Sequence, residues 1–398
     1  MTVTKEQTQL RILLLHSRPL NFATAVGGLP EFLKAITFEF KTMGLDVLIY
    51  AGDKSSSHIQ HTSYVHDTIK VINGPLLQPQ YWVSSKKLRL LTDFCQDQQI
   101  TVMHAQGTYT PGFMVREIAK VTQIPYVITS HSDIHPKNSM RLKRANVRKR
   151  CYRILRDAAW ITHLSPTMQQ ASDQLYDSHG KSSLIHNGIH IENRKSCAPI
   201  SEKKYLLSIG RLVREKGFHV LIEMYAELLK RGVTSALVIA GAGDYEHPLR
   251  QQCTQLGLKT LTGLNKVDEI PEKCVVFTGY VRGELKQQLL NHCQFVLFAT
   301  QPDTCEEAFG LVQLEAMAAS KALIASDIAA ARYLQNLGMQ AIIVPPSHIP
   351  TWVTAAEQLL KNPEQRLTMG TANTVLAEQF NWRTIAKQYY AVYQRVVG

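Results

Sequence analysis

The sequence predicts an α/β protein with two doubly wound parallel-sheet domains. Short apolar or β-branched runs followed by turn residues recur along the chain, as expected for strands that are buried on both faces. Segments with helical spacing separate several of these runs. One of them spans 29–43 and stops at Gly44, where glycine easily adopts a left-handed cap. The alternation of strands and helices implies parallel sheets.

The predicted strands fall into two sets. Those of the first half are RILLLHS, DVLIYAGD, TVMHAQG, PYVITSHS, AAWITHLSP and SSLIHNGI. After the polar segment 196–204 the pattern restarts with YLLSIGRL, ALVIAGAGD, VVFTGYV, FVLFAT, ALIASDI and AIIVPP. The final segment predicts a helix that docks one apolar stripe on a domain, because its apolar residues recur at spacings of three and four. That stripe comprises Trp382, Ile385, Tyr389, Val392 and Val396.

Length and composition indicate a soluble globular protein of more than one domain. The chain has 398 residues, of which 45% are hydrophobic and 19% charged. The seven cysteines form no Cys-x-x-Cys pair, which predicts reduced thiols in a cytosol. No apolar run approaches the ~20 residues of a spanning helix. We therefore expect a cytoplasmic protein that is neither secreted nor inserted in a membrane.

Positive charge is concentrated in one stretch. The net charge is +12, and the densest cluster runs from Lys137 to Arg156 with no acidic residue before Asp157. Such a cluster suits an anionic lipid surface or another polyanion, but it equally fits a solvated helix face with some residues near an anionic substrate. The lack of interleaved aromatic residues and of a nucleic-acid motif argues against a nucleic-acid partner. Weak contact with an anionic membrane surface stays a hypothesis.

The most informative motif follows the predicted strand FVLFAT and a polar loop. Glu307 is expected in that loop, and Gly310 would permit close approach of the backbone to a ligand. A helix is expected to open at Leu311, with its free amides and positive dipole end facing an anion. Glu315 can turn its carboxylate towards the same site and accept hydrogen bonds from vicinal hydroxyls, such as those of ribose.

The stretch EAFGLVQLE resembles the Glu-x7-Glu signature of retaining glycosyltransferases of family 4, group 1. This large family includes enzymes similar to sucrose synthase and to phosphatidylinositol mannosyltransferase. The resemblance implies that Glu307 contacts hydroxyls of the transferred sugar and that Glu315 contacts the ribose of a nucleotide-sugar donor. Donor contacts are also implied for Phe309, Gly310 and Leu311.

A second motif lies directly after the first strand of the second half. The stretch GRLVREKG closely resembles the family's Gly-Arg-Leu...Lys-Gly loop. Cations at such a position can stabilise the charge that accumulates on a diphosphate leaving group. The resemblance therefore assigns Gly210, Arg211 and Lys216 to donor binding, with Arg211 and Lys216 also catalytic. Arg214 carries no role from the family.

Further positions carry weaker resemblance. Gly28 belongs to a glycine pair that follows the first strand, where the family places a glycine loop beside the donor phosphates and the acceptor. His131 ends the strand PYVITSHS, where the family has a histidine that faces the donor sugar, so we expect it to be catalytic. Asn187 and Gly188 resemble the turn that closes the family's first domain, although His190 replaces the usual aspartate, and the resemblance assigns Asn187 to donor binding. Val281 lies in a segment expected to line the nucleobase pocket through its backbone.

The resemblance implies the GT-B architecture, in which two Rossmann-like domains face each other across a cleft. The expected division is an acceptor-binding domain over 1–195, a donor-binding domain over 204–375, and a helix over 376–398 that crosses back to the N-terminal domain. No Asp-x-Asp occurs in the chain, and no His or Cys cluster has metal-ligand spacing. We therefore expect no metal and no cofactor, with cations replacing the metal.

The expected reaction is retaining transfer from a nucleotide diphosphate sugar, with UDP as the family's commonest nucleotide, to an acceptor hydroxyl. The acceptor could be a glycan, a lipid-linked sugar or a small molecule. Two alternatives are a sugar-nucleotide epimerase on the same fold and a non-catalytic subunit that binds a sugar nucleotide. The Glu pair argues against the first. The intact set of Arg211, Lys216, Glu307 and Glu315 argues against the second.

Overall fold

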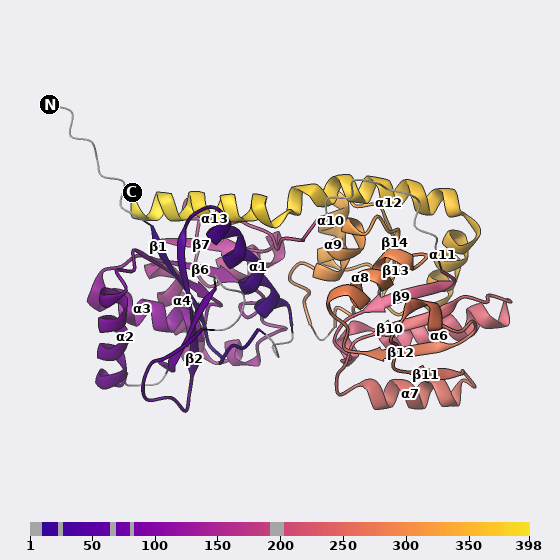
Figure 1. The fold of residues 1–398 in the computed structure, drawn as a ribbon, viewed down its shortest axis with the longest axis horizontal. Helices are drawn as coiled ribbons and strands as arrows, with labels where there is room; N and C mark the ends of the chain where they lie inside the picture. Colours follow the sequence, from indigo (N-terminus) through magenta and orange to yellow (C-terminus); the bar gives the residue numbers. More distant parts are fainter. Residues whose placement is uncertain (1–9, 23–26, 64–68, 80–82, 192–202, 304) are drawn as a thin grey trace. The chain divides into compact units, whose positions relative to one another are not determined.

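The computed structural model describes residues 10–22, 27–63, 69–79, 83–191, 203–303 and 305–398. The chain forms two compact units (Figure 1). The N-terminal unit comprises Met1–Gly188 and Trp382–Gly398, and the C-terminal unit comprises Ile189–Asn381. Residues 196–202 of the polar segment at which the sequence pattern restarts lie outside the described residues.

The N-terminal unit is built on an eight-stranded sheet in the order β3-β4-β2-β1-β5-β6-β7-β8. All neighbouring strands are parallel except β3 and β4, which are antiparallel. The strands are β1 (Arg11–His16), β2 (Asp46–Asp53), β3 (Gln60–Ser63), β4 (Lys70–Pro75), β5 (Val102–Gln106), β6 (Tyr126–Ser130), β7 (Trp160–His163) and β8 (Ser182–Leu184). The central strands are buried along nearly their whole length, as their apolar runs predict.

Helices cover this sheet, and the last of them comes from the end of the chain. They are α1 (Gly28–Thr42), α2 (Ser85–Asp97), α3 (Thr110–Thr122), the 3-10 turn η1 (Met140–Lys143), α4 (Ala145–Asp157), α5 (Pro166–Asp173) and α13 (Trp382–Val397). Helix α13 packs against α1 and buries most of the apolar stripe that the spacing predicts (Figure 1). Its Tyr393 hydroxyl lies 2.6 Å from Nδ1 of His104 in β5, whose Nε2 lies 2.7 Å from the Thr129 hydroxyl.

The C-terminal unit is built on a seven-stranded parallel sheet in the order β11-β12-β10-β9-β13-β14-β15. The strands are β9 (Tyr205–Ile209), β10 (Ala236–Ala240), β11 (Thr260–Thr262), β12 (Val275–Gly279), β13 (Val296–Phe298), β14 (Leu323–Ser326) and β15 (Ala341–Val344). The helical elements are η2 (Arg214–Lys216), α6 (Phe218–Lys230), α7 (Glu246–Gln255), η3 (Val267–Glu269), α8 (Gly283–His292), α9 (Leu311–Ala318), α10 (Ala329–Asn336), α11 (Ile349–Lys361), α12 (Pro363–Ala377) and η4 (Glu378–Phe380).

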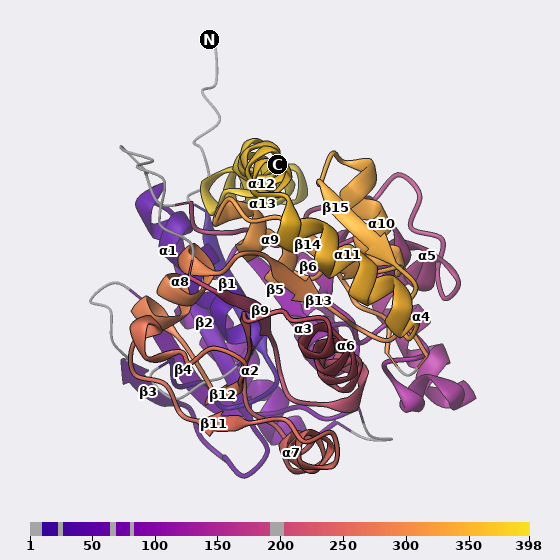
Figure 2. The ribbon, with the colours of Figure 1, turned by 90° about the vertical axis from the view of Figure 1, so that its right-hand side faces the viewer.

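Both sheets are doubly wound, which confirms the predicted fold class, and Figure 2 shows the helices of each unit from a second side. The sequence pattern missed three strands that lie at or next to a sheet edge: β3, β4 and β11. β3 and β11 are edge strands, which need little burial, so their sequences carry a weak apolar signal. β11, for example, has no buried residue. β4 is not at the edge and is largely buried, so this reason does not apply to it. Among the described helices, none is both long and apolar enough to cross a membrane.

Candidate functional site

The loops of the C-terminal unit that carry the two motifs meet at one edge of its sheet. Strand β9 lies between β10 and β13, so the strand order reverses there. Open α/β sheets bind ligands outside the carboxyl ends of the strands at such a reversal. The loop 210–217 follows β9, and the segment 299–310 follows β13. Topology alone therefore brings the two motifs to the same place.

The loop 210–217 is joined to the segment after β13 by a backbone hydrogen bond, in which Gln301 N–H donates to the carbonyl of Glu215 at 2.7 Å. Within that segment, the Gln301 side-chain amide donates to the Ala299 carbonyl at 2.6 Å. Gly217 has a φ of 70°, in the left-handed region, and is the N-cap of α6. A Cβ on Gly217 would collide with the Ala299 carbonyl oxygen. Only glycine lets the chain turn here at this separation.

A second glycine turn supports the same loop from the other side. Leu212 N–H donates to the Ala242 carbonyl at 2.9 Å, and Gly210 N–H donates to the Ala240 carbonyl at 3.0 Å. Gly241 and Gly243 approach this loop so closely that a Cβ on either would collide with its backbone oxygens. The resulting loop is fixed on both sides, which limits the positions that Lys216 can reach.

Lys216 and Glu307 form an ion pair that links the two motifs. The Lys216 ammonium donates to Oε2 of Glu307, and the two side chains are 26% and 18% exposed. The ammonium also lies 5.8 Å from the centre of the Phe298 ring. Partial burial strengthens this electrostatic contact relative to a fully solvated pair. The pair places a positive and a negative group side by side at the strand edge, still within reach of a ligand.

Arg211 does not join that pair. Its side chain is 70% exposed, and its guanidinium lies 3.8 Å from the Glu215 carboxylate. Arg214, which carries no expected role, is likewise exposed. The structure therefore brings Lys216 and Glu307 together, whereas Arg211 lies on the same loop with its guanidinium directed to a neighbouring carboxylate.

Glu315 lies on α9 and is paired with a residue that the sequence analysis did not single out. Lys286, on α8, donates to Glu315 Oε1 at 2.6 Å, while Glu315 Oε2 is buried without a hydrogen-bond partner among the described residues. Both residues line a pocket of about 190 Å³ within the C-terminal unit. The other lining residues are Ile189, His190, Gly283, Gln287, Leu290 and Ala318. An unsatisfied buried carboxylate oxygen beside a pocket can accept a hydrogen bond from a ligand hydroxyl.

The remaining predicted donor residues of this unit offer backbone groups. Gly310 has a φ of 77° and precedes α9, so Leu311 opens the helix as predicted. The ring of Phe309 is buried against Phe380, with ring centres 5.6 Å apart, so Phe309 can offer a ligand only its backbone. Val281 is buried beyond the end of β12.

The predicted residues of the N-terminal unit lie at the carboxyl edge of its own sheet. His131 directly follows β6, and its Nε2 lies 3.0 Å from Oε1 of Gln106 at the end of β5. Its ring meets Phe32 of α1 edge-on, with ring centres 5.3 Å apart. Burial, with a smaller contribution from His16, lowers the pKa of His131 to about 3, so the ring is neutral near neutral pH.

Gln106 therefore orients His131, a contact that the sequence pattern did not indicate. An amide oxygen can only accept, so the Nε2 of His131 carries the proton and Nδ1 is left as an acceptor. Asp133 accepts hydrogen bonds from the amides of Thr108 and Tyr109 at 2.6 and 3.2 Å, just before α3 begins. This contact gives Asp133 the structural role of holding the turn that precedes α3.

Gly28 and Asn187 complete the predicted set. Gly28 opens α1 and is exposed, so nothing in its own unit covers this turn among the described residues. Asn187 is buried, and its Oδ1 has no partner among the described residues. Gly188 lies against the Trp382 ring, where a Cβ would collide with the indole.

Across the described ranges, no three His, Cys, Asp or Glu side chains are grouped so that they could hold a metal ion.

Replacing Gly217 by alanine should destabilise the C-terminal unit more than replacing Gly232. Both glycines have left-handed φ values, 70° and 83°. A left-handed alanine costs roughly 1–2 kcal/mol at either position, but only at 217 would the Cβ collide, whereas no described atom lies within 4 Å of it at 232. Overpacking adds about 1–3 kcal/mol. Urea unfolding measures the difference, and equal losses in the two variants would contradict the close approach.

The stability of the N-terminal unit should fall as the pH drops below about 6.5. Burial lowers the pKa values of His16 and His163 to about 4 and those of His104 and His131 to about 3. The unfolded chain therefore binds more protons than the folded one between these values and about 6.5, so acid favours unfolding. At about pH 5 each of these histidines lowers the free energy of unfolding by up to about 2 kcal/mol.

Urea unfolding at about pH 7 and about pH 5 measures this loss. His163→Met provides a matched comparison, because both ring nitrogens of His163 are buried without a partner among the described residues. That variant should take up one proton fewer on unfolding, so its stability should vary less with pH. A wild-type stability that is equal at both pH values would show that these histidines titrate normally in the folded protein.

Two family models match the chain and together cover most of it. The model described as "Glycosyl transferases group 1" matches residues 190–374. The model described as "Glycosyltransferase Family 4" matches residues 26–193. The second match ends and the first begins close to Gly188 and Ile189, where the two compact units meet along the chain.

Curated relatives match about half of the chain, and the chain spans about half of their length. An uncharacterised glycosyltransferase of Methanocaldococcus jannaschii is 28% identical over 228 residues, which is 54% of each chain. The alpha-D-kanosaminyltransferase of Streptomyces kanamyceticus is 28% identical over 198 residues, covering 50% of this chain and 47% of the relative.

Solved structures match along almost the whole chain. Sucrose-phosphate synthase of Thermosynechococcus elongatus superposes with a TM-score of 0.73 at 17% identity, covering 97% of this chain and 98% of that one. Anabaena HepE, solved in complex with UDP-glucose, gives a TM-score of 0.71 at 18% identity, covering 97% and 100%. The two doubly wound units and these structural matches show the GT-B fold. The two family models show that the chain belongs to the group 1 glycosyl transferases of glycosyltransferase family 4.

Proposed function

We propose that this protein is a retaining, metal-independent glycosyltransferase that moves a sugar from a nucleotide diphosphate sugar, with UDP as the expected nucleotide, to an acceptor hydroxyl. The observation that carries the proposal is the Lys216–Glu307 ion pair at the carboxyl ends of β9 and β13. Two relatives of the same fold support the donor class, since HepE was solved with UDP-glucose and the trehalose-6-phosphate synthase of E. coli with UDP-2-fluoro glucose.

Lys216 is the cation best placed to replace a metal. As the bond between the sugar's anomeric carbon and the phosphate oxygen breaks, negative charge grows on the diphosphate. A preorganised ammonium at that point lowers the barrier, because it is already oriented and partly shielded from water. Arg211, exposed on the same loop, can turn to the diphosphate and supply a second cation. The amides at the start of α9, beyond Gly310, supply further donors.

In this proposal, Glu307 and Glu315 bind different parts of the donor. When the diphosphate pairs with the Lys216 ammonium, the carboxylate of Glu307 becomes able to accept hydrogen bonds from hydroxyls of the sugar. Glu315 keeps Lys286 on one oxygen and offers its other, unpartnered oxygen to the ribose. Gly210 and the backbones of Val281 and Phe309 border the donor.

The N-terminal unit is proposed to bind the acceptor. Within it, His131 is proposed to be catalytic, and Gly28 and Asn187 are proposed to contact the donor. Neutral His131 can accept a hydrogen bond on Nδ1, because its Nε2 proton is engaged by Gln106. In retaining transfer the acceptor oxygen attacks the anomeric carbon from the face that the phosphate leaves. The departing phosphate oxygen takes the acceptor's proton. One structural relative, a trehalose-6-phosphate synthase, was solved to study the mechanism of glycosyl transfer with retention.

Removing either partner of the ion pair should abolish most of the activity. Lys216→Met and Glu307→Gln are each expected to lower the rate of donor hydrolysis by about 10²–10³-fold, the effect of deleting one transition-state contact. Release of free nucleotide from UDP, GDP, ADP and dTDP sugars is measured in EDTA, with water as acceptor. Configuration at the released sugar's anomeric carbon is read by proton NMR and should match that of the donor.

Arg214→Met is the matched control, because Arg214 lies in the same loop and is exposed. It should hydrolyse the donor at close to the wild-type rate. Because Lys216 and Glu307 contact each other, the double variant should lose less activity than the product of the two single losses. Near-normal rates in both single variants would refute the assignment, and a rearranged sugar that appears without any acceptor would instead indicate an epimerase.

A further inference from the structure

The segment from Lys137 to Arg156 takes no part in the proposed reaction, yet it holds most of the protein's net charge. Nine of the 44 Lys and Arg residues lie in it and none of the 32 acidic residues, so it accounts for nine of the twelve net positive charges. The structure folds this segment into the turn η1 and helix α4, at the right-hand side of Figure 2. We define five of its exposed cations as the basic surface: Arg141, Lys143, Arg144, Lys149 and Arg153.

Helix α4 is amphipathic, with its apolar side anchored in the N-terminal unit. Val147, Cys151, Ile154 and Leu155 are buried. The opposite side presents Lys149, Tyr152 and Arg153, which are all exposed. Neither Lys149 nor Arg153 makes a hydrogen bond or an ion pair with any other described residue.

The cations of the basic surface oppose the stability of their own helix. Arg144 is the N-cap of α4, and the first turn contains no acidic residue. Cations at this end face the positive end of the helix dipole, which is unfavourable. Lys149 and Arg153 are spaced four residues apart, where like charges repel. Folding therefore does not explain this arrangement, whereas an anionic partner would relieve both repulsions.

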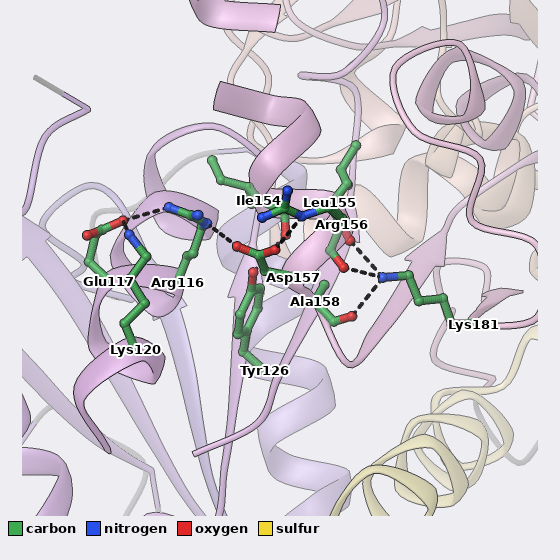
Figure 3. Close-up of polar contacts among 10 residues, drawn as sticks. All are labelled: Arg116, Glu117, Lys120, Tyr126, Ile154, Leu155, Arg156, Asp157, Ala158 and Lys181. Carbon is green, nitrogen blue, oxygen red and sulfur yellow. Dashed lines mark hydrogen bonds and ion pairs between the residues drawn. The ribbon is translucent and has the colours of Figure 1, made fainter. Parts of the chain in front are cut away.

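The far end of α4 is fixed by polar contacts, so the basic surface is preformed. Figure 3 shows the Lys181 ammonium donating to the carbonyls of Leu155, Arg156 and Ala158 at 3.1, 2.6 and 3.1 Å. A cation at the carboxyl end of a helix satisfies free carbonyls and suits the dipole. The first acidic residue after the segment, Asp157, is held there by two arginines.

Asp157 accepts from Arg116 Nε and Arg156 Nε, at 2.7 Å each (Figure 3). These two contacts hold the pKa of Asp157 below its ordinary value despite the opposing effect of burial. The carboxylate is thus engaged at the end of the helix and leaves Lys149 and Arg153 uncompensated. Within the described residues, the basic surface faces outward with no internal counter-charge for these two cations.

We propose that the basic surface of η1 and α4 binds the anionic headgroups of a lipid bilayer. Exposed apolar groups among the cations favour a bilayer over a nucleic acid or another soluble polyanion. Met140 is 66% exposed and Tyr152 is 41% exposed. At a membrane interface a thioether and a phenol ring can enter the headgroup layer while neighbouring cations contact phosphates. In this arrangement the N-terminal unit, proposed to bind the acceptor, is the part that touches the membrane.

Flotation of the full-length protein with lipid vesicles tests the proposal. The protein should float with vesicles of phosphatidylcholine mixed with phosphatidylglycerol at low salt, and should remain unbound with phosphatidylcholine alone. Binding should weaken as salt is added, because the screening length falls from about 30 Å at 0.01 M to about 8 Å at 0.15 M. No flotation with anionic vesicles at low salt would overturn the proposal, and so would equal flotation with both vesicle types.

The variant Lys149→Glu/Arg153→Glu should lower the partition coefficient onto anionic vesicles by at least about 25-fold, since each cation near the surface contributes roughly five-fold. Its donor hydrolysis without vesicles should equal that of the wild type. The matched control is Lys361→Glu/Lys387→Glu, which changes the net charge equally at exposed positions on α11 and α13. That control should bind like the wild type, and equal loss in both variants would show a mere net-charge effect and overturn the proposal.

Competition separates the bilayer from other polyanions. Double-stranded DNA or heparin, added at the same phosphate or sulfate concentration as the vesicle lipid, should displace little protein from anionic vesicles. Met140→Ser should weaken vesicle binding without changing heparin binding, because only the bilayer uses the apolar side chain. Tighter binding to heparin or DNA than to vesicles, or no effect of Met140→Ser on vesicle binding, would overturn the membrane assignment.

Discussion

The structure of the candidate donor site depends on one close approach: the loop after β9 touches the end of β13. Gly217 makes this contact possible because its backbone is left-handed and a side chain there would strike the Ala299 carbonyl. The Gln301 amide then joins the two segments. With the loops held together, Lys216 contacts Glu307, and the sheet edge carries a paired cation and carboxylate. The contact between Lys216 and Glu307 thus depends on the absence of a side chain at position 217.

The fold could be predicted from the sequence because strands buried on both faces leave unmistakable apolar runs. The site was partly predictable for a related reason: Lys216, Glu307 and Glu315 lie at fixed distances from strand ends, and topology brings those ends together. Partners at long sequence distance were not predictable. Lys286, which holds Glu315, and Gln106, which orients His131, depend on side-chain directions that no local pattern records. Edge strands such as β11 were missed because they are scarcely buried.

The two units differ in the charge of the side chains at the edges of their sheets. The edge of the C-terminal sheet holds ionised groups that neutralise one another, while the edge of the N-terminal sheet holds neutral histidines whose pKa values are lowered by burial. A neutral, hydrogen-bonding surface suits recognition of hydroxyls, and a surface with partly exposed cations suits a diphosphate. The densest cluster of cations in the N-terminal unit lies instead on η1 and α4, where Lys149 and Arg153 are paired with no acidic residue among those described.

Calorimetric titration of UDP into the protein in the presence of EDTA tests the central claim most directly. The account predicts that UDP binds without a divalent cation and that adding Mg²⁺ or Mn²⁺ changes its affinity little. It also predicts that Lys216→Met weakens UDP binding by about ten-fold to a hundred-fold, the loss expected for a charged hydrogen bond of about 1.5–3 kcal/mol. UDP binding that appears only after metal is added, or that is unchanged in Lys216→Met, would contradict it.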